Sequence, residues 1–354
     1  MKDCCLESAR SFFVSNYPLS GNEADDHLAA RLVDLCKKWG PITSRLADGF
    51  YIRCTNSLRL GVDAKTAGIQ CTCGGYVPFI FIGSRLFYFI WRINMVCLTY
   101  WGAPNSNGAG VISFEGSSDW PKEEHLRQVG LAIEMYFGQS PLLSTQGLEE
   151  LNKLIAASQP TAAVMHTNIV DLAELFVLFH EIQHQLPLSK LAAQPPPYRL
   201  DLANFPELPP ARASRWTDEL THDANAVFLL LESVASVLAT HHGMAHDDAR
   251  TQAAILVCTG ADAALHTLQL LEEMRHGRVS VAEAASARPF KYHPPSLERR
   301  NLLSVYAYSL ITEKDADALR RREFTPIWKS VAGNVAGHMR VRDTLFERYK
   351  AWRK

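Results

Sequence analysis

The chain has 354 residues, of which 47% are hydrophobic, and a formal net charge of −1 at pH 7. This length and apolar content are sufficient for a sizeable core in one large domain or two closely packed ones. The near-neutral charge gives no reason to expect a nucleic-acid partner. The first residues lack a basic segment followed by an apolar run and a small-residue cleavage site, so we expect no signal peptide and a cytoplasmic location.

The N-terminal third of the chain changes from helical to β-rich character at Pro41. Helices are predicted for residues 3–17 and 22–39, and the second ends with Lys37 and Lys38 before Gly40. Short β-branched and aromatic runs separated by Gly, Asn and Ser continue as far as Phe114. These runs predict strands at residues 49–55, 58–62, 77–82 and 111–114.

The eight cysteines show no regular disulfide framework, and we expect most of them to be reduced. Alternation along a strand would place Cys71 and Cys73 on one face. Their spacing is shorter than that of the usual zinc knuckle. We therefore predict that these two residues form a structural pair.

The most apolar stretch is residues 77–101. Its length suits a membrane span, but Arg85 and Arg92 lie inside it, and proline, glycine and asparagine divide it into pieces of strand length. We predict buried strands here. The alternative is a hairpin that contacts a membrane, because exposed aromatic side chains with arginines suit an interface.

The chain beyond residue 115 is predominantly helical in pattern. The fold class predicted is therefore α+β, with a small N-terminal β-sheet region. We expect an α/β-rich region at residues 1–120 and a helical region at 121–354 that packs with it as one compact unit. Helices are predicted at 119–137, 143–157, 168–186, 214–239, 247–275, 295–311 and 339–354, with a histidine-rich turn at 241–246.

The helix at residues 168–186 carries His180-Glu181-Ile182-Gln183-His184. Two histidines four residues apart project from one face of a helix, and neutral imidazoles at that spacing can hold one Zn²⁺. Apolar residues at helical spacing indicate that this helix is amphipathic and buried. The alternative is a core helix with two incidental histidines.

A proline-rich connection separates this motif from a second apolar helix, which begins at Ser214 and carries Glu219 and Asp223 on one face. One interpretation of the two acids is a solvated first turn that is stabilised by the helix dipole. His222 is a rival metal ligand, although it lies off the face that Glu219 and Asp223 share.

The HExxH segment and the later ExxxD segment together resemble the gluzincin branch of the zincin metallopeptidases, over about residues 165–230. The longer metzincin motif is excluded, because it requires Gly and His where this chain has Pro187 and Lys190. The resemblance implies that His180, His184 and Glu219 bind Zn²⁺. It further implies that Glu181 takes a proton from water at the metal and that Asp223 accepts a hydrogen bond from a ligand histidine.

Residues 291–300 resemble the HPPxxxR segment that follows the zinc helices of several HExxH peptidases. By this resemblance His293 or Tyr292 is expected to reach the cleft and stabilise an oxyanion. The alternative is that Pro295 simply begins a helix, where its missing N–H costs nothing.

The sequence thus predicts a zinc-dependent endopeptidase that hydrolyses protein or peptide substrates, with Glu181 as general base. In zincins an edge strand commonly aligns the substrate backbone, and the N-terminal sheet is the candidate for it. Two alternatives remain at this point. One is a non-catalytic interaction protein that keeps the zincin scaffold for binding, and the other is a membrane-associated factor that uses residues 77–101.

Overall fold

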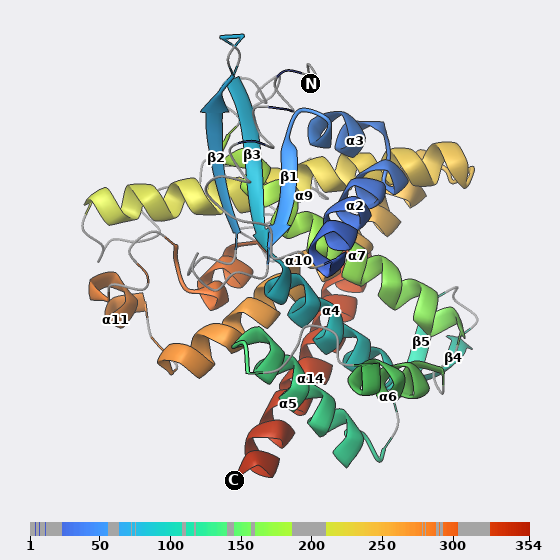
Figure 1. Cartoon of the computed structure of the whole chain (residues 1–354). Helices are drawn as coiled ribbons and strands as arrows, with labels where there is room; N and C mark the ends of the chain where they lie inside the picture. Colours follow the sequence, from blue (N-terminus) through green and yellow to red (C-terminus); the bar gives the residue numbers. More distant parts are fainter. Residues whose placement is uncertain are drawn as a thin grey trace.

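The fold is α+β and predominantly helical, as predicted (Figure 1). The structure is a computed structural model that describes residues 4, 7, 11, 23–55, 64–71, 73–74, 76–107, 111–116, 118–139, 145–156, 160–185, 210–277, 279, 281–287, 290, 293–303 and 326–354. The helices are α2 (Glu23–Lys38), α3 (Pro41–Ala47), α4 (Ser84–Leu98), α5 (Glu123–Tyr136), α6 (Thr145–Ala156), α7 (Pro160–Gln183), α9 (Pro210–His241), α10 (His246–His276), α11 (Val281–Ser286) and α14 (Pro326–Arg353). The strands are β1 (Tyr51–Thr55), β2 (Ala64–Gln70), β3 (Tyr76–Gly83), β4 (Trp101–Asn107) and β5 (Val111–Gly116).

Helix α7 is the central element of the molecule. It contacts α2, α4, α9 and α10 as well as β2, β3 and β4. Its side chains from Ile169 to Gln183 are all buried, whereas the sequence indicated one buried face. A helix surrounded by other elements is apolar on all sides, which explains the difference. Its buried acids Asp171 and Glu174 lie against α2, where Arg31 donates to both carboxylates.

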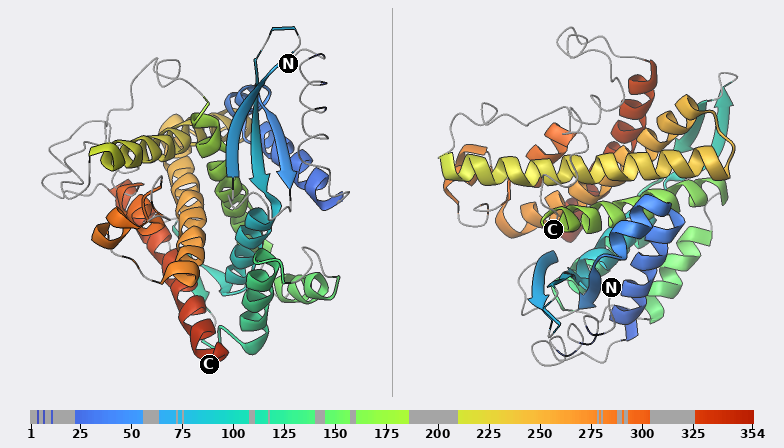
Figure 2. Two further views of the ribbon diagram at one scale, coloured as in Figure 1. Left: turned by 60° about the vertical axis from the view of Figure 1, so that its left-hand side comes forward. Right: turned by 90° about the horizontal axis from the view of Figure 1, so that it is seen from above.

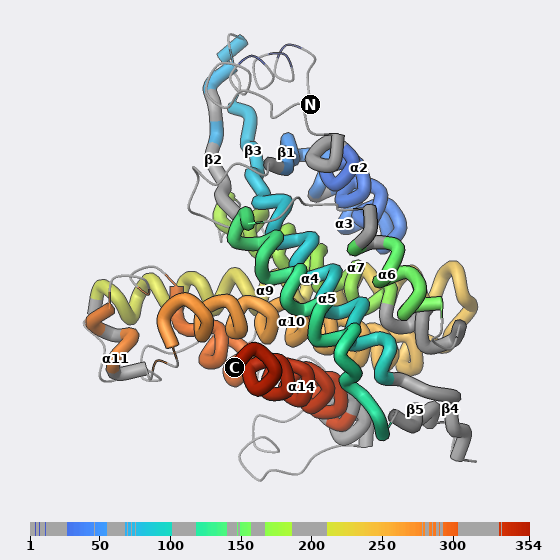
Figure 3. The backbone as a smooth tube through the Cα atoms, turned by 60° about the horizontal axis from the view of Figure 1, so that its bottom comes forward, coloured from blue at the N-terminus to red at the C-terminus, as the bar shows by residue number. Residues whose placement is uncertain are grey.

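Two long helices, α9 and α10, pack against α7 and against each other. Figure 2 shows α9 crossing the whole width of the molecule. Helix α10 approaches α7 closely at Gly260, because a Cβ at that position would lie 2.8 Å from Leu172 Cβ and 3.1 Å from the backbone nitrogen of Ala173. Helix α14 covers the other side of α10 and also contacts α5 (Figure 3). The HExxH segment is therefore carried by a helix that contacts several neighbouring helices and strands.

The main sheet has the strand order β1-β3-β2, in which β1 runs parallel and β2 antiparallel to β3. The predicted strands at 49–55, 77–82 and 111–114 are confirmed as β1, β3 and β5. The strand predicted at 58–62 lies outside the described residues. Strands β2 and β4 have the sequences AKTAGIQ and WGAPNSN, which contain few β-branched residues, and they were not predicted from the sequence.

The prediction of strands throughout residues 77–101 is wrong for its second half, because Ser84–Leu98 forms helix α4 directly after β3. The partly exposed positions of α4 include the large side chains Tyr88, Trp91 and Met95, so the sequence shows no polar face that would distinguish a helix from a strand. Arg92 is accommodated inside the fold, since it donates to Gln128 Oε1 at 2.7 Å and to the carbonyl of Gly147 at 2.9 Å.

The other predicted helices agree with the structure in position and differ mainly at their ends. Helices α2, α5, α6 and α10 are confirmed to within four residues, and the histidine-rich segment after α9 is a turn as predicted. Helices α7, α9 and α14 begin earlier than predicted, at Pro160, Pro210 and Pro326. Residues 296–303 are helical, whereas 304–311 and most of 3–17 lie outside the described residues.

Two helices, Ala211–His241 and His246–His276, are long and apolar enough to cross a membrane by length and composition alone. The most apolar windows of these helices are 56% and 83% buried inside the protein. Since core helices of soluble proteins pass the same test, this is weak evidence for a membrane span.

Candidate metal centre

The end of α7 carries the first part of the candidate centre. His180 lies in the last turn of α7, and His184 directly follows its last residue, Gln183. The helical turn is closed there by a hydrogen bond from Gln185 N to Ile182 O at 3.0 Å. The side chain of Gln185 accepts a hydrogen bond from Tyr76 Oη at 3.1 Å, so the start of β3 contacts the end of the motif.

Glu219, on α9, brings its carboxylate between the two histidines. Its Oε2 lies 3.2 Å from His180 Nε2, and its Oε1 lies 3.7 Å from His184 Nε2. The two Nε2 atoms are 3.3 Å apart. His180 and Glu219 are buried, and 24% of the His184 side chain is exposed. These three residues could together hold a metal ion.

The distances among the three donor groups suit one small cation, with each imidazole facing a different oxygen of the Glu219 carboxylate. Ligands that lie 2.0–2.1 Å from Zn²⁺ in tetrahedral geometry are separated from each other by about 3.3 Å. The separations of 3.2, 3.3 and 3.7 Å are close to that value. The donor set fits, because two imidazoles and one carboxylate leave a fourth position open.

Asp223, one turn after Glu219 on α9, lies on the far side of His180. Its Oδ1 is 2.8 Å from His180 Nδ1, which is hydrogen-bonding distance and leaves Nε2 directed at Glu219. The same carboxylate accepts hydrogen bonds from Arg299 Nε at 2.8 Å and from Arg299 Nη2 at 2.7 Å. Both partners are buried. The arrangement holds the orientation of the His180 ring through a fixed carboxylate.

Arg299 is the functional residue that the sequence analysis did not assign. It is the arginine of the HPPxxxR segment, so a signal for it was present in the sequence. The pattern gave it no partner, because Asp223 belongs to another helix and the contact between them depends on the tertiary fold. Bidentate binding of a carboxylate explains why this position requires the planar fork of arginine.

His293 lies at the centre, as the HPPxxxR segment led us to expect. Its Nδ1 is 2.8 Å from Glu219 Oε2, and 48% of its side chain is exposed. It therefore connects the candidate ligand Glu219 with solvent. Tyr292, the other expected oxyanion donor, lies outside the described residues.

His222, the rival ligand, lies beside the other two histidines. Its ring centroid is 4.2 Å from that of His184 and 5.9 Å from that of His180. The three-residue group that could hold a metal contains Glu219 and not His222. Within the part of the chain that the structure describes, His222 Nδ1 has no hydrogen-bond partner. The geometry thus favours Glu219 as the third ligand and places the ring of His222 against the ring of His184.

Glu181 is buried next to the converging ligands. Burial raises the pKa of its carboxyl, and the nearby charge of Glu219 raises it further. The positive charges of His180, His293 and Arg299 oppose this effect and lower the pKa. A raised pKa makes this carboxyl a stronger proton acceptor than an ordinary glutamate, which suits a general base.

The surrounding charges bias the ligands in different ways. Burial alone would lower the pKa of His180, but Asp223 and Glu219 raise it to about 9. Burial and the charge of His180 lower the pKa of His184 to about 3, so this imidazole is neutral at pH 7. Burial would raise the pKa of Glu219, but hydrogen bonds with His180 and His293 hold it far below its ordinary value. Neutral His184 and ionised Glu219 are already in the forms that bind metal, whereas His180 must release a proton when a metal ion binds.

Comparison with known proteins gives no match. No family model matches the chain, and neither a curated protein nor a solved structure matches it. The assignment of the centre therefore depends on its own geometry and chemistry.

Proposed function

We propose that this protein is a zinc-dependent endopeptidase with a zincin-like arrangement of helices, in which His180, His184 and Glu219 hold the ion. The observation that carries the proposal is the convergence of these three donor groups beside the buried carboxyl of Glu181. Two imidazoles and one carboxylate are the ligands of a known class of catalytic zinc sites in peptidases. The proposal is consistent with the HExxH and ExxxD pattern of the sequence.

When bound, Zn²⁺ supplies Lewis-acid chemistry, because it lowers the pKa of a water molecule and polarises a carbonyl oxygen. Glu181 takes the proton of the attacking water and passes a proton to the leaving amine. Asp223 orients the ring of His180, and Arg299 fixes Asp223. His293, which is half exposed beside Glu219, supplies a donor to the developing oxyanion.

The substrate in this proposal is an extended polypeptide that pairs with strand β2. Strands β1 and β2 are the two edges of the main sheet. Helix α2 contacts β1, whereas β2 contacts α7, which carries the motif. An exposed strand edge binds an extended chain through main-chain hydrogen bonds, with little dependence on side chains. This arrangement would hold a peptide carbonyl near the centre.

The test combines metal content with peptidase activity. Zinc per chain is measured by mass spectrometry, and hydrolysis is measured on a proteome-derived peptide library whose new N-termini are identified. We expect His180→Ala and Glu219→Ala each to lose one zinc per chain. Glu181→Gln is expected to keep the zinc and to lose activity by roughly 10²–10⁴-fold. The control is Glu149→Gln on α6, an exposed glutamate whose replacement should change neither quantity.

The variant His222→Asn separates the two possible third ligands, because it keeps zinc under the proposal. Loss of zinc in His222→Asn, together with retention in Glu219→Ala, would show that Glu219 is wrongly assigned. A wild-type protein that binds no zinc after reconstitution contradicts the metal centre. A zinc-bound Glu181→Gln variant that cleaves peptides as fast as the wild type contradicts the catalytic role of Glu181. A zinc-bound wild type that cleaves no peptide contradicts the peptidase and favours a binding scaffold.

A further inference from the structure

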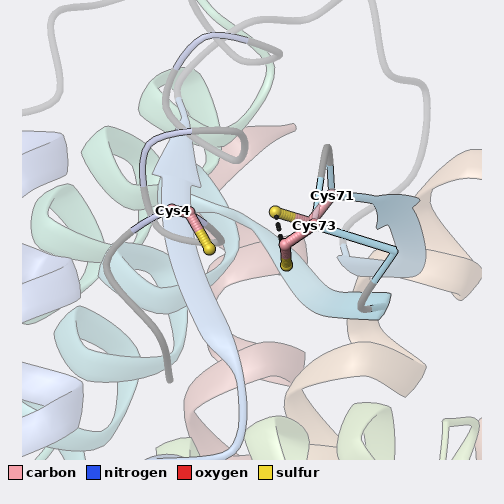
Figure 4. A group of neighbouring side chains, drawn as sticks. All are labelled: Cys4, Cys71 and Cys73. Atoms are coloured by element: carbon pink, nitrogen blue, oxygen red, sulfur yellow. Dashed lines mark hydrogen bonds between the residues drawn. The ribbon is translucent and has the colours of Figure 1, made fainter.

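Three cysteine thiols converge at the connection between β2 and β3 (Figure 4). Cys71 follows the last residue of β2, and Cys73 lies two positions later, with its Sγ 3.2 Å from that of Cys71. Cys4 comes from the start of the chain and directs its sulfur at this pair. The three sulfur atoms all lie within 4.8 Å of one another. The sequence predicted a structural pair on one strand face, whereas the structure places the pair in a hairpin connection with a third thiol.

The hairpin connection holds two of these thiols on one side. The backbone N–H of Gly74 donates to the carbonyl of Cys71 at 2.9 Å, which closes a tight turn around Cys73. Gly74 has a φ of +78°, a conformation that favours glycine. The turn is therefore set by the backbone, and the two sulfur atoms are brought together before any ion binds.

The separation of the sulfur atoms suits a thiophilic divalent cation. Thiolates bind Zn²⁺ at 2.3 Å, so two of them on a tetrahedral ion lie about 3.8 Å apart. The separation of one pair is 3.2 Å and no pair is more than 4.8 Å apart, so small side-chain rotations would bring the three sulfur atoms to this spacing. Three thiolates supply three of the four ligands of tetrahedral Zn²⁺, and a water molecule fills the fourth position.

One cysteine of the cluster is buried and another is exposed, which suits a metal site. Cys71 is 3% exposed and packs with Val77 and Tyr51, so one side of the cluster is apolar. Cys73 is exposed, so an ion can reach the sulfur atoms from solvent. The apolar surroundings of Cys71 strengthen charge interactions with a bound ion, and the exposed position of Cys73 permits metal exchange with solvent.

We propose that Cys4, Cys71 and Cys73 form a second, structural zinc site that joins the start of the chain to the β2–β3 hairpin. Binding converts three thiols to thiolates and releases three protons to solvent. The same hairpin positions Tyr76, which donates to Gln185, the residue that directly follows the HExxH segment. The site therefore stabilises the part of the sheet that contacts the first centre. It shares no ligand with that centre, and the inference does not depend on peptidase activity.

The test uses Co²⁺ as a spectroscopic probe on the full wild-type chain, reduced with a thiol-free reductant. Thiolate ligands give Co²⁺ an intense charge-transfer absorption in the near ultraviolet, whereas imidazole and carboxylate ligands do not. We expect this band to rise to one equivalent and to be displaced by Zn²⁺. Cys73→Ser and Cys4→Ser should abolish the band and lower the zinc content by one ion per chain. Cys258→Ala, which removes a buried thiol from α10, should leave both unchanged.

Circular dichroism of each variant verifies that it is folded, and Cys73→Ser is the most informative variant because its side chain is exposed. The proposal is overturned if the reduced wild type shows no thiolate band with Co²⁺, or if the band persists in both Cys4→Ser and Cys73→Ser. The result is independent of the first centre, because loss of His180 or Glu219 would not remove a thiolate band.

Discussion

Replacing Asp223 by asparagine tests the contact that connects the fold to the candidate metal centre. Asparagine keeps the size and shape of the side chain and removes its charge. In the wild-type protein the Asp223 carboxylate lies 2.8 Å from His180 Nδ1 and accepts two hydrogen bonds from Arg299. An amide can accept at only one of its two atoms, so one buried donor would face an NH₂ group. The buried guanidinium would also lose its counter-charge.

The magnitude follows from the pKa of Asp223. Burial raises this pKa, but Arg299 and His180 lower it from 3.8 to about 2. At about 1.36 kcal/mol per pKa unit, the surroundings favour the ionised carboxylate by about 2 kcal/mol. We therefore expect Asp223→Asn to reduce the free energy of unfolding of the metal-free protein by about that amount. Zinc affinity should fall by roughly 10–100-fold, because His180 loses the partner that orients its ring.

The assays are urea unfolding in the presence of EDTA and competition for Zn²⁺ with a chromophoric chelator. The matched control is Asp218→Asn, which removes an exposed carboxylate from the same helix. It should change stability by less than about 0.5 kcal/mol and leave zinc affinity unaltered. An Asp223→Asn protein that binds zinc as tightly as the wild type would refute the argument that this carboxylate orients a ligand. If Asp223→Asn leaves the free energy of unfolding unchanged, the electrostatic reasoning is refuted.

Two further predictions concern α7. Gly260→Ala places a Cβ 2.8 Å from Leu172 Cβ, so α10 must move away from α7. We expect the free energy of unfolding, measured in urea, to fall by about 1–3 kcal/mol. An increase in this free energy, as for an exposed helical glycine, would contradict the close packing. Burial raises the pKa of Glu174 from 4.5 to about 7 in spite of the opposing charge of Arg31. Because the folded state then holds the proton more tightly than the unfolded state, wild-type stability should fall as pH rises through this window. Glu174→Gln should lack this component, so parallel stability–pH curves for the two proteins would contradict the prediction.

Local patterns in the sequence were sufficient for much of the candidate site. Helical spacing alone places His180 and His184 on one side of α7, and the same spacing relates Glu219 to Asp223 on α9. These relations depend on residues within one turn of each other, so no knowledge of the remaining fold is required. The helices α2, α5, α6 and α10 were predictable for the same reason, because caps, charges at helix ends and periodicity are local signals.

Other features depended on contacts between distant parts of the chain. Whether residues 84–98 form a strand or a helix could not be decided from a predominantly apolar run, and packing against α5 and α7 accompanies the helical form. The pairing of Arg299 with Asp223 and the meeting of Cys4 with Cys71 join segments that are remote in sequence.

The sequence by itself thus determined which residues are available as ligands and how neighbours on one helix are spaced. Only the tertiary structure decided which donor atoms meet, because side chains on separate elements converge through packing of the whole core around α7. The pKa shifts of the centre also follow from that packing, since burial and opposing charges act only after the elements have assembled.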